Sequence, residues 1–252
     1  MHAVIAVIPA RFASTRLPGK ALADIAGVPM IVRVWQQTRQ ARLLQRVLIA
    51  TDDERIANAI RDAGGEVEMT ASSHASGTDR IAEVARRVPA DVYLNVQGDQ
   101  PFIAPEDIDA VAKIMTGEPK ILMATLAAPI DDFEEWRNPN KVKIVCDNQG
   151  YALYFSRSPI PYFRDGTGVP SGALRHVAVY GYRRDLLLSF AALAPGGLEQ
   201  TEKLEQLRAM EHGYRIRVVG SVAPSLEVDT PEDLARAIEA AGRGSLGVGP
   251  GR

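Results

Sequence analysis

The 252-residue sequence has one cysteine, few aromatic residues (6%) and almost no net charge, and these shortages exclude several classes of protein. Cys146 cannot form an internal disulfide or a cysteine-based zinc cluster, and its apolar neighbours indicate a structural residue. A net charge of −2 argues against binding nucleic acid through bulk electrostatics, so we expect no nucleic-acid partner. No apolar run approaches the roughly eighteen residues of a membrane span, and no signal-like core follows the first residues. The composition therefore predicts a cytoplasmic protein without membrane insertion.

The first half of the sequence alternates between strand-like and helix-like segments. Apolar runs at 4–8, 46–50, 66–69 and 91–96 predict strands, and amphipathic patterns at 30–43, 54–63, 76–87 and from Pro105 predict helices. Continuous apolar strands separated by helices are typical of a parallel sheet that is covered on both faces. Residues 1–117 are therefore predicted to form a mainly nucleotide-binding α/β part.

The pattern changes after residue 117. Segments 121–127, 142–146, 151–156, 177–182 and 216–219 resemble strands, the first three of them antiparallel, and helices are expected at 202–210 and from Pro231 to Ala241. We interpret 118–241 as a mixed substrate-binding part of the same domain that returns to the core near 214–241. The glycine-rich residues 242–252 are predicted to be a flexible tail.

The segment IPARFASTRLPGK (8–20) follows the first strand and carries three fixed positive charges. It is not a Walker A loop, because Ser14 stands where the first glycine should be, and no GxGxxG pattern follows the strand. Arginine and lysine side chains in such a loop neutralise phosphate charge. The loop therefore predicts a polyphosphate site that includes Pro9, Ala10, Arg11, Ser14, Arg16 and Lys20.

Two aspartates are candidates for a metal site. Asp99 follows the strand at 91–96, where its carboxylate would face the basic loop, and Asp229 precedes the last helix. Two carboxylates are a common protein contribution to a Mg²⁺ site that is completed by phosphate oxygens. Alone, Asp99 could equally be a turn residue and Asp229 a helix cap.

Eight segments in chain order resemble the 3-deoxy-manno-octulosonate cytidylyltransferase family. They are IPARFASTRLPGK (8–20), HASGTDR (74–80), NVQGDQP (95–101), NPNKVKIV (138–145), YALYFSRSPIP (151–161), RHVAVYGYR (175–183), LEQLR (204–208) and VDTPEDL (228–234). The resemblance runs from residue 4 to about 238. The RLPGK run distinguishes the chain from the similar sialate cytidylyltransferases.

This resemblance implies a Rossmann-like nucleotide-diphospho-sugar transferase fold, with a mostly parallel central sheet and an inserted antiparallel β region. It also implies Mg²⁺-dependent transfer of CMP from CTP to 3-deoxy-D-manno-octulosonate (KDO), for lipopolysaccharide biosynthesis, by a homodimer. Arg11, Lys20 and Asp99 would be catalytic, and Asp99 and Asp229 would hold the metal. The residues Ser76, Gly77, Arg80 and Gln97 are expected on the nucleotide side.

The sugar side is expected to combine one cation with neutral and acidic polar groups. Arg157 is the candidate partner of the sugar carboxylate, and His176 and Tyr180 are four apart on one predicted strand face. Glu202, Glu205 and Gln206 fall at helical spacing and could share one face. For each the structural alternatives remain open: a surface arginine, a core histidine and a solvated helix face.

One position departs from the family pattern, in which Glu-Pro usually follows Gln-Gly-Asp, because this chain has Gln100-Pro101. A missing formal charge there could alter metal affinity or sugar choice. The alternatives are therefore a cytidylyltransferase for another acidic sugar (amino-KDO or a sialate-like sugar), or a non-catalytic nucleotide-binding protein.

Overall fold

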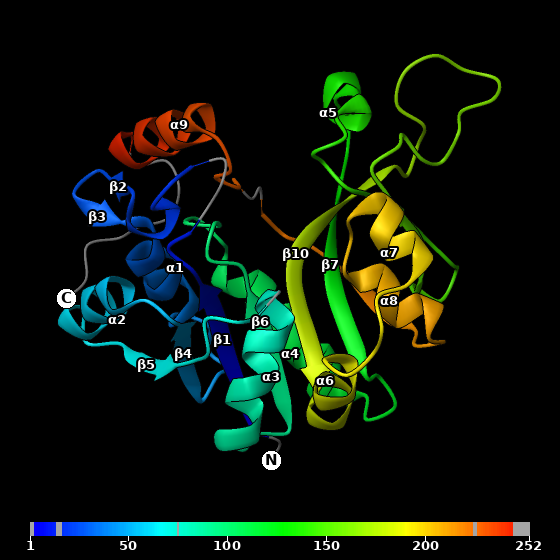
Figure 1. Cartoon of the computed structure of the whole chain (residues 1–252). Coiled ribbons are helices and arrows are strands. Elements are labelled where there is room, and N and C mark those ends of the chain that lie inside the picture. The colour runs from blue at the N-terminus through cyan, green and yellow to red at the C-terminus, as the bar shows by residue number, and fades with distance from the viewer. Residues whose placement is uncertain (1–2, 14–16, 75, 224–225, 244–252) are drawn as a thin grey trace.

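The computed structural model describes residues 3–13, 17–74, 76–223 and 226–243. Its main sheet contains β1 (Val4–Ala10), β4 (Arg46–Thr51), β5 (Glu66–Met69), β6 (Val92–Val96), β7 (Met123–Pro129), β8 (Lys143–Cys146), β9 (Ala152–Ser156), β10 (Leu174–Arg183) and β11 (Ile216–Gly220). Seven of these strands follow the order β11–β7–β10–β6–β1–β4–β5, and β8 and β9 extend from β10 (Figure 1).

Six of the seven strands along this path run in the same direction. The pairs β1–β4, β1–β6, β4–β5 and β7–β11 are parallel, whereas β10 is antiparallel to both of its neighbours, β6 and β7. The hairpin of β8 and β9 adds further antiparallel pairs. The predicted α/β class, a mostly parallel sheet with an antiparallel region, is confirmed. Both predicted parts of the chain contribute strands to this one sheet.

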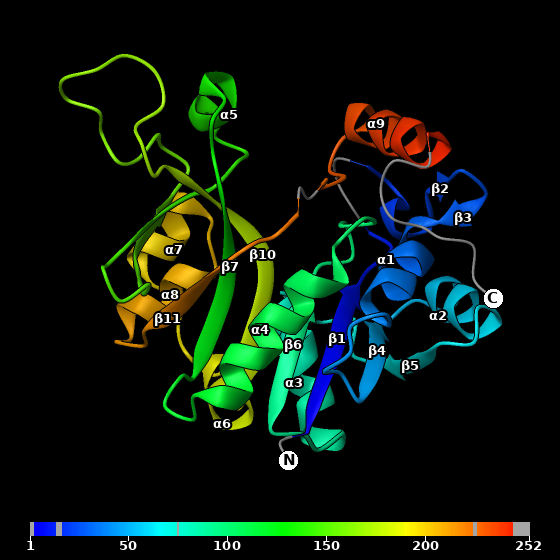
Figure 2. The same ribbon diagram turned by 180° about the vertical axis from the view of Figure 1, so that it is seen from behind.

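Helices cover both faces of the sheet (Figures 1 and 2). They are α1 (Met30–Thr38), α2 (Glu54–Asp62), α3 (Gly77–Arg87), α4 (Pro105–Gly117), α5 (Phe133–Arg137), α6 (Arg184–Phe190), α7 (Gly197–Glu202), α8 (Gln206–Glu211) and α9 (Pro231–Gly242), with a 3₁₀ turn η1 (Lys20–Leu22) and a small hairpin, β2 (Asp24–Ile25) and β3 (Val28–Pro29). Alternate β1 residues pack with α1, α2 and α4 on one face and with α3, α6 and α8 on the other. This explains why the β1 sequence is apolar throughout.

Two helices begin as their sequences predict. Ser76 caps α3 and Thr230 caps α9, and in each helix an aspartate three residues later completes a capping box. Pro231 occupies the first turn of α9, where a missing N–H costs nothing. These caps fix the amino ends of α3 and α9 beside the residues discussed below.

Three expectations about local structure are corrected. The predicted helix 202–210 is two helices, because Lys203 adopts a left-handed backbone (φ 54°) that ends α7 before α8 begins. Helix α1 ends at Thr38 rather than at Leu43. The short elements α5, α6, η1, β2 and β3 were not predicted, since each is too brief to show a period.

Residues 244–252, most of the predicted tail, lie outside the described residues. Within the part of the chain that the structure describes, no helix is long and apolar enough to cross a membrane.

The strand order creates a switch point at β1. β1 pairs with β4 on one side and with β6, which comes later in the chain, on the other. The segments that follow β1 and β6 therefore leave the carboxyl ends of these strands in different directions. Ligands of open α/β sheets bind at such points. The segment after β1 and the Gln97–Asp99 turn after β6 therefore face the same crevice.

Candidate active site

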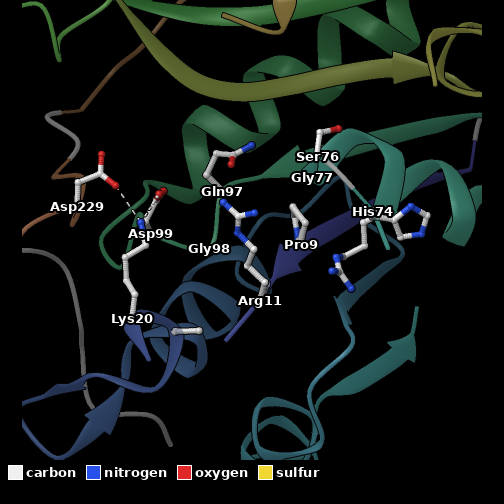
Figure 3. Close-up of a pocket in the computed structure, with 13 residues that line it drawn as sticks. Pro9, Arg11, Lys20, His74, Ser76, Gly77, Gln97, Gly98, Asp99 and Asp229 are labelled. Atoms are coloured by element: carbon white, nitrogen blue, oxygen red, sulfur yellow. Dashed lines mark hydrogen bonds and ion pairs between the residues drawn. The ribbon is translucent and has the colours of Figure 1, made fainter. Parts of the chain in front are cut away.

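A cavity of about 290 Å³ lies at this crevice (Figure 3). It is lined by Pro9, Ala10, Arg11, Lys20, Ala21, His74, Ser76, Gly77, Arg80, Gln97, Gly98, Asp99 and Asp229. The structure thus brings together all of the predicted nucleotide and metal residues that it describes. Ser14 and Arg16, which were also predicted, lie outside the described residues.

Two glycines shape the floor and the rim of the cavity. A Cβ atom at Gly98 would lie 3.1 Å from the carbonyl oxygen of Pro9, so any larger residue there would push the turn after β6 away from the end of β1 by a few tenths of an ångström. Gly19 has φ 68° and packs beside the ring of Phe12. This left-handed residue reverses the loop and delivers Lys20 to the cavity.

Lys20 joins the two predicted metal ligands. Its Nζ lies 2.9 Å from Asp99 Oδ2 and 2.9 Å from Asp229 Oδ1, as Figure 3 shows. Burial alone lowers the pKa of Lys20, but these two carboxylates together raise it above the ordinary value of 10.5. The ammonium group is therefore charged at neutral pH.

The same geometry tests whether the site fits Mg²⁺. Asp99 and Asp229 come from segments far apart in sequence, yet one oxygen of each converges on a single point, now marked by the ammonium nitrogen of Lys20. Carboxylate oxygens are the donors that Mg²⁺ prefers, with substrate phosphates completing its shell. The described residues contain no cluster of three or more metal-ligating side chains. Two carboxylates that need phosphate oxygens fit a metal that binds together with a nucleotide.

Arg11 and Arg80 have different surroundings. Arg11 is exposed at the end of β1 and has no hydrogen bond or ion pair with any other described residue. Arg80 is buried, with Nη2 3.0 Å from Asp52 and Nη1 2.5 Å from Thr70. Arg11 is thus available to an anion, whereas Arg80 supports the wall of the cavity.

His74 also lines the cavity, although no role was predicted for it. Its Nε2 lies 2.5 Å from Glu83 Oε2, and the Ala71 N–H donates to the same oxygen at 2.9 Å. Burial raises the pKa of Glu83, but these contacts together lower it below its usual value. One carboxylate of α3 therefore orients the segment that enters the helix. The motif HASGTDR contains His74, but its partner nine residues away gives no local signal.

On the sugar side, Arg157 and Glu202 are bound to each other's segments. Glu202 Oε1 accepts from the Ser156 hydroxyl at 2.6 Å, and its Oε2 accepts from the Arg157 N–H at 2.9 Å. The Arg157 guanidinium donates to the carbonyl oxygens of Pro139, Glu202 and Lys203. The expected shared helix face of Glu202 and Glu205 is therefore wrong, because Glu202 ends one helix and faces β9.

His176 and Tyr180 lie close together, as predicted, with ring centroids 5.2 Å apart. His176 is only 8% exposed, and burial, aided by Arg175, lowers its pKa to about 3. The Thr125 hydroxyl donates its one proton to the carbonyl oxygen of Val179 at 2.9 Å. Since His176 Nε2 lies 2.9 Å from the same hydroxyl oxygen, Nε2 must be the donor in that second hydrogen bond. This network assigns a neutral imidazole whose Nδ1 is an acceptor.

An acidic residue that the sequence did not single out connects the two sides. Glu227 is paired with Lys141 at 3.4 Å; burial raises its pKa, and the Asp99 carboxylate adds to the rise. Burial also raises the pKa of Tyr180, with smaller contributions from Glu205 and Glu227. Glu227 therefore interacts electrostatically both with Asp99 and with Tyr180, a residue predicted for the sugar side.

An α/β sheet whose cationic loop faces two convergent carboxylates is the architecture of a nucleotidyltransferase. A family model described as cytidylyltransferase matches residues 5–216. The chain belongs to the family of 3-deoxy-manno-octulosonate cytidylyltransferases. It is 52% identical over 245 residues to the protein of that name from Geobacter sulfurreducens, covering 94% of this chain and 98% of the relative.

Two further comparisons agree. The 3-deoxy-manno-octulosonate cytidylyltransferase of Syntrophotalea carbinolica is 52% identical over 248 residues, covering 96% of this chain and 99% of the relative. A solved structure of CMP:2-keto-3-deoxy-manno-octonic acid synthetase complexed with CTP superposes with a TM-score of 0.90 at 42% identity, covering 96% of this chain and 99% of that one.

Proposed function

We propose that this enzyme transfers CMP from CTP to KDO and releases pyrophosphate. The anomeric hydroxyl of the sugar attacks the α-phosphorus in line, a new P–O bond forms, and the bond to the pyrophosphate oxygen breaks. The observation that carries the proposal is the convergence of Lys20, Asp99 and Asp229 in a cavity that Arg11 also lines. Such chemistry depends mainly on positioning and charge neutralisation.

The residues of the cavity divide these tasks. Arg11 and Lys20 bind the triphosphate and stabilise the charge that develops on the leaving pyrophosphate. Asp99 and Asp229 would hold Mg²⁺, which when bound polarises the α-phosphate and acidifies the attacking hydroxyl. Pro9, Ala10, Ser76, Gly77, Arg80 and Gln97 form the nucleotide side, and Ser14 and Arg16 remain predicted members of it.

The sugar side is proposed to consist of Arg157, His176, Tyr180, Glu202, Glu205 and Gln206. Arg157 has N–H groups beyond the three carbonyl contacts that it makes, and these suit the sugar carboxylate. The neutral His176 accepts a hydrogen bond from a sugar hydroxyl through Nδ1. The Glu202 carboxylate accepts from the backbone N–H of Arg157, so it supports Arg157 rather than facing the sugar directly.

Pyrophosphate release tests the proposal. The protein is incubated with CTP and Mg²⁺ and with KDO, 8-amino-KDO or N-acetylneuraminate, and the nucleotide sugar is identified by mass spectrometry. We expect CMP-KDO and a kcat/KM at least about tenfold higher for KDO than for the other sugars. Absence of turnover with KDO would refute the proposed function. Preference for another acidic sugar would show that cytidylyl transfer is right but that KDO is not the acceptor.

The assembly and the cellular role are proposed on the same basis: a cytoplasmic homodimer that activates KDO for lipopolysaccharide biosynthesis. Leu153 on β9 and Tyr162 in the long loop after it are 58% and 85% exposed, and these two apolar side chains are our candidates for contact with a second copy. Light scattering should give twice the chain mass of 27.3 kDa, and Leu153→Ser with Tyr162→Ser should shift it toward the monomer. An unchanged dimer would place the interface elsewhere.

A further inference from the structure

A side-chain hydrogen bond joins the amino end of α3 to Glu205, the residue before α8. The Thr78 hydroxyl donates to Glu205 Oε2 at 2.5 Å, although the two residues are 127 positions apart. Thr78 is only 1% exposed, and the contact is partly buried. Ile81 and Ala82 of α3 belong to the same hydrophobic core cluster as Leu207 of α8.

The remaining groups around the Glu205 carboxylate hold it less closely. Its Oε1 is buried and has no hydrogen-bond partner among the described residues. Arg208 Nη2 is 3.8 Å from that oxygen, and Arg208 is already bound to both oxygens of Glu199 at 2.6 and 2.8 Å. Burial raises the pKa of Glu205, and the hydroxyls of Ser76 and Thr78 offset part of the rise. The Thr78 hydroxyl is therefore the short contact that fixes the carboxylate.

We propose that Thr78 is a positioning residue for the sugar side, whose hydroxyl sets the orientation of Glu205 from the helix that also forms the nucleotide wall. Ser76 and Gly77, the two residues before Thr78, line the nucleotide cavity, while Thr78 itself does not. The first turn of α3 thus touches the nucleotide with one edge and the sugar-binding carboxylate with the other. This inference rests on the proposed function, because it takes Glu205 as a sugar-binding residue.

The test separates the KM values of the two substrates. Thr78→Val keeps the shape but removes the donor, which leaves Glu205 Oε2 without its short hydrogen bond. Since a hydrogen bond to a charged group is worth about tenfold in binding, we expect the KM for KDO to rise about tenfold, with the KM for CTP within about twofold of wild type. Thr78→Ser, which keeps the hydroxyl, should stay near wild type.

Matched variants guard against a merely structural effect. Thr116→Val removes a hydroxyl that donates within α4 and should change neither KM. When Glu205→Gln is already present, adding Thr78→Val should raise the KM for KDO by less than about twofold over Glu205→Gln alone. Thr78 acts through the Glu205 carboxylate, so its effect should be lost once that carboxylate has been replaced. If Thr78→Val has a lower melting temperature than wild type, Thr78→Ala, which has a smaller side chain, repeats the test.

The outcomes also separate this inference from the proposed function. If wild type does not turn over KDO, the function fails. If wild type is active but Thr78→Val and Thr78→Ala change both KM values equally or not at all, or if Thr78→Ser is equally impaired, the positioning role is overturned.

Discussion

The backbone N–H of Val228 donates to the carbonyl oxygen of Asp99 at 2.9 Å. This bond joins the turn after β6 to the segment that leads into α9, and it places Asp229 opposite Asp99. The segment is anchored at its other end by Asp107 of α4, whose carboxylate accepts from the Ser221 hydroxyl and the Val222 N–H, both at 2.7 Å. These three hydrogen bonds, none of which involves a ligand, hold the segment that carries Asp229 beside the turn that carries Asp99.

Asp99→Asn should abolish most of the activity while leaving the fold intact. The amide can still accept from Lys20, but it lacks the charge that holds a divalent cation. We expect kcat to fall at least about 100-fold and the Mg²⁺ concentration for half-maximal rate to rise. Asp62→Asn, at an exposed position of α2, is the control. Near-normal Mg²⁺-dependent turnover would contradict the assigned role.

Lys20→Met should lower stability in a pH-dependent way. Because the folded pKa of Lys20 is above the ordinary 10.5, its contribution is complete below that pH and is lost as the pH rises through the folded value. At neutral pH we expect a loss of about 1–2 kcal/mol in the free energy of unfolding, since the pairs are partly exposed. Urea unfolding measures it, with Lys113→Met as the exposed control. A wild-type advantage that does not shrink as the pH rises above 10.5 would contradict the linkage.

Lys143 predicts the opposite pH dependence. Its side chain is fully buried, Nζ donates to the carbonyl oxygens of Asn138 and Lys141, and burial, with Arg157, lowers its pKa to about 8. Between that value and the ordinary 10.5, the unfolded chain holds a proton that the folded chain has released. The free energy of unfolding of wild type, relative to Lys143→Met, should therefore rise with pH across this window.

Urea unfolding measures the free energy of unfolding of wild type and of Lys143→Met at each pH. The difference between the two values isolates the effect of Lys143 from that of other groups that titrate in the same pH window. Lys113→Met again serves as control. A difference that stays flat from about pH 8 to pH 10.5 would show that Lys143 remains charged in the folded protein.

Gln100→Met should leave stability unchanged or raise it by up to about 1 kcal/mol. Gln100 is fully buried, and neither polar atom of its amide has a hydrogen-bond partner among the described residues. Gln100→Glu, which introduces the residue that the resemblance leads us to expect there, should instead destabilise the protein at neutral pH, because it buries a charge. Burial raises the pKa of such a carboxyl, so this penalty should vanish as the pH falls to about 4. Thermal melting at both pH values measures it. A loss of more than about 1 kcal/mol in Gln100→Met would show that the amide is hydrogen-bonded.

Sequence patterns predicted those parts of the fold whose signals are local. The strand at 66–69 follows a Gly-Gly stop, and α9 begins with a cap and a proline, so both boundaries could be read within a few residues. The break at Lys203 could not, because lysine has no preference for a left-handed backbone and only the surrounding packing selects it. Helix 202–210 was therefore predicted as continuous.

The cavity was predicted better than the sugar side for a related reason. Strand ends that share a direction meet at one edge of a sheet, so Arg11 and Asp99 could be expected to lie together. The contacts of Thr78 with Glu205 and of Lys141 with Glu227 join segments 127 and 86 positions apart, and no local pattern encodes them. Only the folded chain shows that Glu202 turns away to β9.

The reversed direction of β10 has a consequence for how acceptor preference could be re-engineered. Val179 pairs with Val96, the last residue of β6, so the first half of β10 projects past the carboxyl end of β6 and pairs there with the end of β7. The long loop at 157–173 enters β10 there (Figure 1). Lengthening or trimming that loop would remodel the acceptor side while the strands that hold the nucleotide keep their register, because loop length adds little to the cost of folding.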